Sequence, residues 1–175
     1  MNTKMSKLAV TLASVVALGG FGVNAYAVDG TAGATATVIT PIAITKVTDL
    51  AFGKFSALTG GTIKVDTDNA ISVTGAVKKG TGSTGTAAKF DVTGDTSNTY
   101  SISHSGTPAL TSGVNTMLLT KVSALTAAAG TTTEVTSGTL TAGTQSIYVG
   151  GTLTVASGQP AGAYIGDVIV TVEYN

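Results

Sequence analysis

The residues that could do chemistry are one histidine and one short acidic stretch. His104 lies between Ser103 and Ser105, and residues 66–69 read Asp-Thr-Asp-Asn, like the start of a calcium loop. Neighbouring residues on a strand point to opposite faces, so the two serines cannot form a catalytic triad with this histidine. The acidic stretch lacks the glycine at the sixth position and the glutamate at the twelfth that a calcium loop uses. We therefore interpret His104 as a surface or cross-strand residue and the acidic stretch as a turn.

The rest of the sequence offers little further chemistry. It contains no cysteine, no tryptophan and no arginine, and its carboxylates are scattered at expected turns. The glycine-rich stretch 80–85 lacks the lysine and serine of a phosphate loop and reads as a hairpin tip. We predict no enzymatic activity, and no catalytic, cofactor-binding or metal-binding residues; a hydrolase would have only His104 and scattered carboxylates behind it.

The beginning of the chain predicts export. Lys4 and Lys7 precede an apolar run from Leu8 to Val23, and Ala25-Tyr26-Ala27 supplies the small residues that a signal peptidase reads. The apolar run is shorter than the roughly 20 residues needed to span a bilayer. We predict a signal peptide over residues 1–27, cleaved after Ala27, and no membrane insertion afterwards. The mature chain then has seven lysines and nine acids, a formal charge of −2 that does not favour nucleic acid.

The composition of the mature chain predicts an all-β fold. β-Branched residues alternate with small polar ones in short stretches that glycines interrupt. Such a series of short strands is typical of a sandwich or barrel, and we expect a single domain over residues 39–175. Its aromatic residues all fall in expected strands, where we interpret them as core. The expected strands are 35–44, 50–55, 62–65, 70–74, 89–93, 99–104, 116–122, 146–156 and 163–174, with a turn at 59–61 and an irregular connection at 121–130.

Several segments together resemble a known family. They are 42–46 with 49–53, 90–94, 148–155, and 159–166 with 170–174. They resemble a bacterial exported family catalogued as domain-of-unknown-function 4402, and the resemblance covers nearly the whole mature chain. It implies a β-sandwich and supplies no catalytic residues.

A second resemblance concerns the end of the chain. Tyr174 is penultimate and Gly162 is fourteenth from the end, which is similar to subunits of chaperone-usher pili. That resemblance implies an immunoglobulin-like β-sandwich lacking one strand, filled first by a periplasmic chaperone and then by the N-terminal extension of the next subunit, with an outer-membrane usher as a further partner. The residues that it marks as an edge strand for assembly are Gly162, Tyr164, Val168, Val170, Val172 and Tyr174.

The segment after the signal peptide has the pattern of such a donor strand. In residues 28–38, Ala32, Ala34, Ala36 and Val38 fall on one face, with glycine and threonines on the other. Pro41 would mark the place where extension becomes domain. The alternative is an ordinary first strand that folds into its own sheet.

Two functions follow from these patterns. The first is a structural subunit of an extracellular filament, assembled from copies of itself by donor-strand complementation and exported through the periplasm to the cell surface. The second is a monomeric secreted or cell-surface β-sandwich that binds glycan or protein through loops such as 78–86 or 124–138. Fibres in native material would favour the first, and a compact monomer the second.

Overall fold

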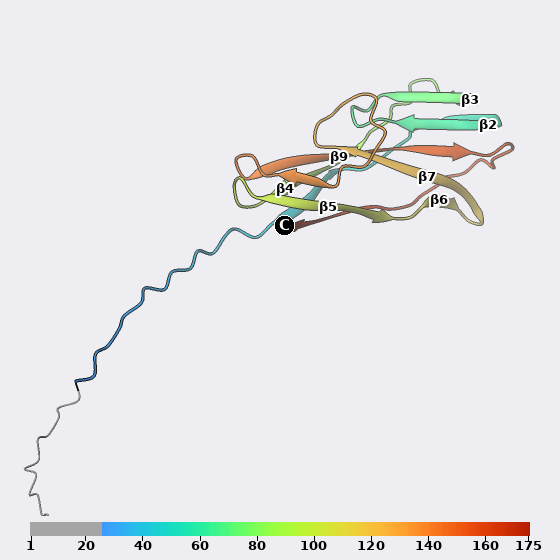
Figure 1. The fold of residues 1–175 in the computed structure, drawn as a ribbon. Helices are drawn as coiled ribbons and strands as arrows, with labels where there is room; N and C mark the ends of the chain where they lie inside the picture. Colours follow the sequence, from blue (N-terminus) through green and yellow to red (C-terminus); the bar gives the residue numbers. More distant parts are fainter. Residues whose placement is uncertain (1–25) are drawn as a thin grey trace, which may run out of the picture. The chain divides into compact units, whose positions relative to one another are not determined.

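A computed structural model describes residues 26–175 of the chain (Figure 1). The chain divides into two units, one up to Thr37 and one over Val38–Asn175, which are described separately. In the first unit, residues 26–37 are exposed and form no strand. The predicted signal peptide lies almost entirely outside the described residues. Within residues 26–175 there is no helix long and apolar enough to cross a membrane.

The second unit is a β-sandwich of two antiparallel sheets, and no helix occurs in residues 26–175. This confirms the predicted all-β fold class. The strands are β1 (Ala43–Thr48), β2 (Phe55–Val65), β3 (Ile71–Lys79), β4 (Ala88–Thr93), β5 (Thr99–Gly106), β6 (Ala109–Ser112), β7 (Asn115–Ala124), β8 (Ser137–Thr139), β9 (Thr144–Val155) and β10 (Val168–Tyr174).

The larger sheet has seven strands arranged around β9. One side of β9 pairs with β4 through residues 144–149 and then with β2 through residues 151–155, while β7 pairs along the other side. β1 pairs with β4, β3 with β2, and β6 with β7. At the change of partner, a Cβ on Gly150 would collide with the Val65 carbonyl oxygen. Glycine therefore lets β2 approach β9 at this point.

The smaller sheet has three strands in the order β10-β5-β8. β10, dark red in Figure 1, pairs with β5 over its whole length, from Val168 opposite Gly106 to Tyr174 opposite Tyr100. One core cluster lies between the two sheets, because it combines Phe90 and Ile147 of the larger sheet with Tyr100 and Val170 of the smaller one.

The strand boundaries differ from the sequence expectations at both ends of the domain. The first strand begins at Ala43 rather than at residue 35, and the last begins at Val168 rather than at residue 163. The short strands β6 and β8 were not predicted. β6 has four residues with one large apolar side chain, Leu110, and β8 has three small residues, so neither is long enough to show apolar alternation.

Two internal expectations were also wrong. Residues 59–61 do not form a turn, because β2 continues through them as an irregularity in its pairing with β3, with positive φ at Gly60 and Gly61. Residues 50–54 form no strand, apart from one bridge between Ala51 and Thr86. Glycines that bend a strand look like turn residues in sequence, because both uses require the same backbone freedom.

Candidate functional site

One edge of β10 is open. β10 pairs with β5, and among the described residues no strand pairs with its other side. Two backbone hydrogen bonds, one at each end of β10, show which of its residues bond to β5. The Asn175 amide donates to the Thr99 carbonyl, and the Thr107 amide donates to the Asp167 carbonyl. Odd-numbered residues therefore point their backbone groups toward β5, and even-numbered residues point theirs outward.

The same even-numbered residues send their side chains inward. Val170 is 7% exposed, and Val168, Val172 and Tyr174 are half-buried, whereas Ile169, Thr171 and Glu173 are exposed. The open edge thus combines unpaired main-chain donors and acceptors with an apolar inner face. This combination is what an additional strand needs for docking, because main-chain bonds supply affinity and alternate side chains supply specificity.

The edge continues upstream of β10. Ile165 exchanges both backbone hydrogen bonds with Thr111 of β6, at 2.8 and 3.0 Å, so the backbone groups of this odd-numbered residue also point toward a neighbouring strand. By the same alternation the backbone groups of Tyr164 and Gly166 face outward. The Tyr164 hydroxyl donates to the Pro160 carbonyl at 2.9 Å and so fixes the chain that leads into this stretch.

An apolar groove lies beside this upstream segment. It has a volume of about 860 Å³ and runs between residues 159–164 on one side and residues 50–57 on the other. Leu153 and Val155 of β9 and Met117 of β7 also line it. All three are buried members of the second core cluster.

The groove marks a part of the larger sheet that the smaller sheet leaves uncovered. The buried residues of the second cluster come from β2, β3, β7 and β9, together with Phe52, and none comes from β5, β8 or β10. Only Val168 of the smaller sheet packs against this cluster, from its margin. One more strand beside β10 would extend the smaller sheet over this region.

The predicted edge residues are distributed over these features. Val168, Val170, Val172 and Tyr174 lie on β10, while Gly162 and Tyr164 precede it and line the groove. A Cβ on Gly162 would meet Ser112 Oγ at 2.7 Å, a contact with a flexible side chain. Sequence reasoning missed the opposite wall, residues 50–57. The one sequence signal in this wall is the pair Phe52-Gly53. In the structure Phe52 is buried and Gly53 has a positive φ.

The predicted donor residues Ala32, Ala34 and Ala36 lie in the first unit. They are exposed and belong to no strand. Val38 begins the second unit and is 96% exposed. Residues 28–38 therefore take part in none of the strand pairings of this molecule, which differs from the alternative of a first strand folded into its own sheet.

The acidic stretch has a structural role. Asp66 is buried, and its carboxylate accepts hydrogen bonds from the Thr67 and Gly130 amides at 2.9 and 2.8 Å and forms an ion pair with Lys64 at 2.9 Å. Burial alone raises its pKa, but the bonds from Lys64 and from the two amides outweigh burial, so the pKa of Asp66 lies below its usual value. Asp66 thus fastens the loop around Gly130. No group of metal-ligating side chains occurs in the described part of the chain.

His104 is a half-buried cross-strand residue. It lies opposite Val170 of β10, while its neighbours Ser103 and Ser105 are exposed on the other face. Burial lowers the pKa of His104, the negative charge of Glu134 raises it, and the positive charge of Lys121 lowers it further. Its ring is thereby favoured in the neutral form.

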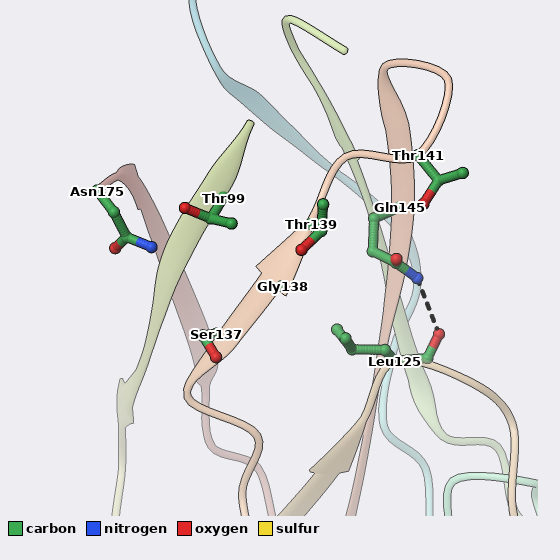
Figure 2. A pocket seen from close by; sticks show the side chains of 8 residues that line it. All are labelled: Thr99, Leu125, Ser137, Gly138, Thr139, Thr141, Gln145 and Asn175. Atoms are coloured by element: carbon green, nitrogen blue, oxygen red, sulfur yellow. Dashed lines mark hydrogen bonds between the residues drawn. The ribbon is translucent and has the colours of Figure 1, made fainter. Parts of the chain in front are cut away.

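A smaller pocket of about 410 Å³ lies at the β8 side of the smaller sheet (Figure 2). Figure 2 shows Ser137 and Thr139 of β8 on one side and Gln145 of β9 on the other. The Gln145 amide nitrogen donates to the Leu125 carbonyl at 3.1 Å and is directed along the pocket wall. The lining has no aromatic ring and no charged side chain, so it offers little for recognising a glycan or a charged ligand.

The two antiparallel sheets place the protein in the class of all-β sandwiches. Residues 42–174 match the model of a family described as a domain of unknown function, DUF4402. The chain belongs to this family, which confirms the family expected from its sequence segments. No curated protein and no solved structure matches the chain.

Proposed function

We propose that this protein is a structural subunit of an extracellular filament, a fimbria or pilus, whose subunits are joined by donor-strand complementation. Residues 28–38 of one subunit would add a strand to the open edge of β10 in the next. The observation that carries the proposal is this edge, where the same residues have backbone groups without a strand partner and direct apolar side chains inward. An unfilled edge of this kind is an aggregation hazard for a lone subunit, and filling it removes the hazard.

The direction of the donor follows from where it leaves its own domain. The Thr40 carbonyl is hydrogen-bonded to Tyr174, so the extension leaves at the end of β10. In a head-to-tail filament it enters the next subunit from the opposite end, near residues 162–164. Val38 would then lie beside the groove, and residues toward Val28 would run toward Tyr174, antiparallel to β10. Such contacts do not close on themselves and therefore produce a filament.

Length and alternation agree with this arrangement. Residues 28–38 and the outward-facing stretch 164–174 contain the same number of residues, each spanning about 33 Å when extended. Pairing Val38 with Tyr164 places Ala34 opposite Val168, with both side chains directed into the space between the sheets. A shift by one residue would instead insert Thr35 and Thr37. The even-numbered face of the extension is thus the face that fits.

The remaining partners rest on the resemblance to pilus subunits. A periplasmic chaperone would hold the open edge before assembly, and an outer-membrane usher would deliver subunits to the filament. The predicted signal peptide supports export. The outer edge of β10 is the surface that chaperone and neighbouring subunit would occupy in turn.

A cysteine cross-link tests the pairing, because the native chain contains no cysteine. In the proposed register Thr31 and Thr171 face each other on the outer surface as a non-hydrogen-bonded pair, with Cα atoms about 4.5 Å apart, which suits a disulfide. The mature Thr31→Cys, Thr171→Cys variant should form a ladder of oxidised oligomers on a non-reducing gel and fibres in negative-stain electron microscopy.

Control pairs of cysteines show whether a cross-link reflects the proposed register or only chance collision of two subunits. Ala32→Cys with Thr171→Cys points the two thiols to opposite faces and should give no ladder. Asp29→Cys or Gly33→Cys with Thr171→Cys detects a register shifted by two residues. An internal disulfide within a monomer, or no cross-link in any of the three odd-numbered pairs, would contradict the proposal. A compact monomer without fibres would instead favour the loop-binding alternative.

A further inference from the structure

The Tyr174 hydroxyl joins three parts of the domain. It accepts a hydrogen bond from the Asp95 amide at 2.6 Å and donates one to the Thr40 carbonyl at 2.8 Å. The ring is half-buried and packs against the first core cluster. A Cβ on Gly94 would collide with this hydroxyl, so glycine is what allows its close approach. The end of β10, the turn after β4 and the chain before β1 therefore meet at one oxygen atom.

This contact lies where the chain becomes part of the domain. Pro41 fixes its own φ and disfavours the helical region for Thr40, which leaves the preceding residue extended. Ile42 then packs against the first core cluster, and Ala43 begins β1. On the other side Val38 is 96% exposed. Thr40 is thus the first residue of the chain, counted from residue 26, whose backbone is bound to the rest of the domain.

We propose that Tyr174 is a positioning residue that fixes the backbone at Thr40 and so fixes the point at which the N-terminal segment leaves the domain. Tyr174 also belongs to the open edge of β10. A strand added at that edge would therefore hold Tyr174 in place. Through the Tyr174 side chain it would also hold Thr40, where the subunit's own extension leaves the domain. This coupling between the receiving edge and the outgoing segment rests on the proposed function, whereas the fixation of Thr40 does not.

Tyr174→Phe tests the fixation, because it removes the hydroxyl and keeps the ring. Hydrogen–deuterium exchange of the mature chain should become about two- to tenfold faster at the Asp95 amide, as expected for one lost hydrogen bond. The backbone amides of Ile39 and Thr40 donate no hydrogen bond to any residue that the structure describes, so loosening there is measured by NMR, and their amide order parameters should fall. Tyr148→Phe is the matched control: it removes a tyrosine hydroxyl on β9, away from the open edge and the groove, and should leave both regions unchanged.

Filaments test the coupling separately. If wild-type filaments form, those of Tyr174→Phe should bend more, with a shorter persistence length in electron micrographs, whereas those of Tyr148→Phe should match the wild type. Unchanged exchange at Asp95 and unchanged order parameters at Ile39 and Thr40 would overturn the positioning role. Faster exchange with wild-type filament stiffness would overturn the coupling alone. If the wild type forms no filaments, the proposed function fails, and the order parameters of Ile39 and Thr40 still decide whether Tyr174 fixes Thr40.

Discussion

A single charge on the inward face of the extension should stop assembly without disturbing the domain. Ala34 is exposed in the subunit and belongs to no strand, so Ala34→Asp costs the isolated subunit almost nothing. In the proposed filament the same side chain faces the space between the sheets, opposite Val168. The carboxylate would be buried there without a cationic partner.

The size of the effect follows from what holds the donor in place. Val168, Val170, Val172 and Tyr174 each offer one amide and one carbonyl, and each hydrogen bond made there contributes about 0.5 to 1.5 kcal/mol. An alanine methyl contributes only about 0.8 kcal/mol. Main-chain bonding therefore dominates, and Ala34→Gly should weaken association less than tenfold. An uncompensated buried charge costs about 3 to 5 kcal/mol, which is a loss of roughly two to three and a half orders of magnitude.

Thr37→Asp is the control, since it adds the same charge on the outward face, opposite the exposed Ile165 in the proposed register. Purified mature subunits would be incubated at equal concentration, and polymer would be measured by sedimentation and negative-stain electron microscopy. We expect polymer from the wild type and from Thr37→Asp, and none from Ala34→Asp or Val38→Asp. Filaments of normal length from Ala34→Asp, or equal loss in both aspartate variants, would refute the assignment of the inward face.

Two predictions concern the stability of the domain. Asp66→Asn should lower the free energy of unfolding by about 1 to 3 kcal/mol near pH 7, because it removes the ion pair with Lys64 and weakens the amide bonds. Since the pKa of Asp66 is lowered on folding, its stabilisation is present above the usual value of 3.8 and is lost as the pH falls through the folded pKa, so urea denaturation should show the variant and wild type converging in acid. Gly138→Ala should cost about 1 to 3 kcal/mol in the same assay, because its Cβ would lie 2.5 Å from the Tyr100 ring and hydroxyl; unchanged stability would show that β8 can move away.

The sequence predicted the fold class because alternation is strong where strands are half-buried. β5 alternates between exposed residues and buried or half-buried ones. From Ile147 to Val155, β9 alternates between buried and less buried residues, with an interruption at Gly150. Both strands were expected nearly at their observed bounds. The beginning of the first strand was predicted wrongly, because the alternating sequence pattern starts before the residues that pair with a neighbouring strand. Residues 35–42 alternate like a strand, but in this molecule they have no neighbouring strand to bond to.

The groove could not be predicted in the same way. Its two walls, residues 50–57 and 159–164, are far apart in the sequence, and neither has a pattern that marks it as a wall. The hollow exists because the second core cluster receives almost no side chains from the smaller sheet. A sequence shows which residues are apolar, but the area left uncovered depends on how many strands each sheet contains.

The open edge of β10 matters because the smaller sheet has three strands and the larger sheet seven. An open edge alone is ordinary, because every sheet that does not close has two. Here the edge of β10 borders a core cluster whose residues belong to the other sheet, and its upstream continuation forms one wall of the groove over that cluster. A strand bound at this edge would pair with β10 and cover apolar surface at the same time. Residues 28–38, exposed and unpaired in their own subunit, have the length and the alternation to do both.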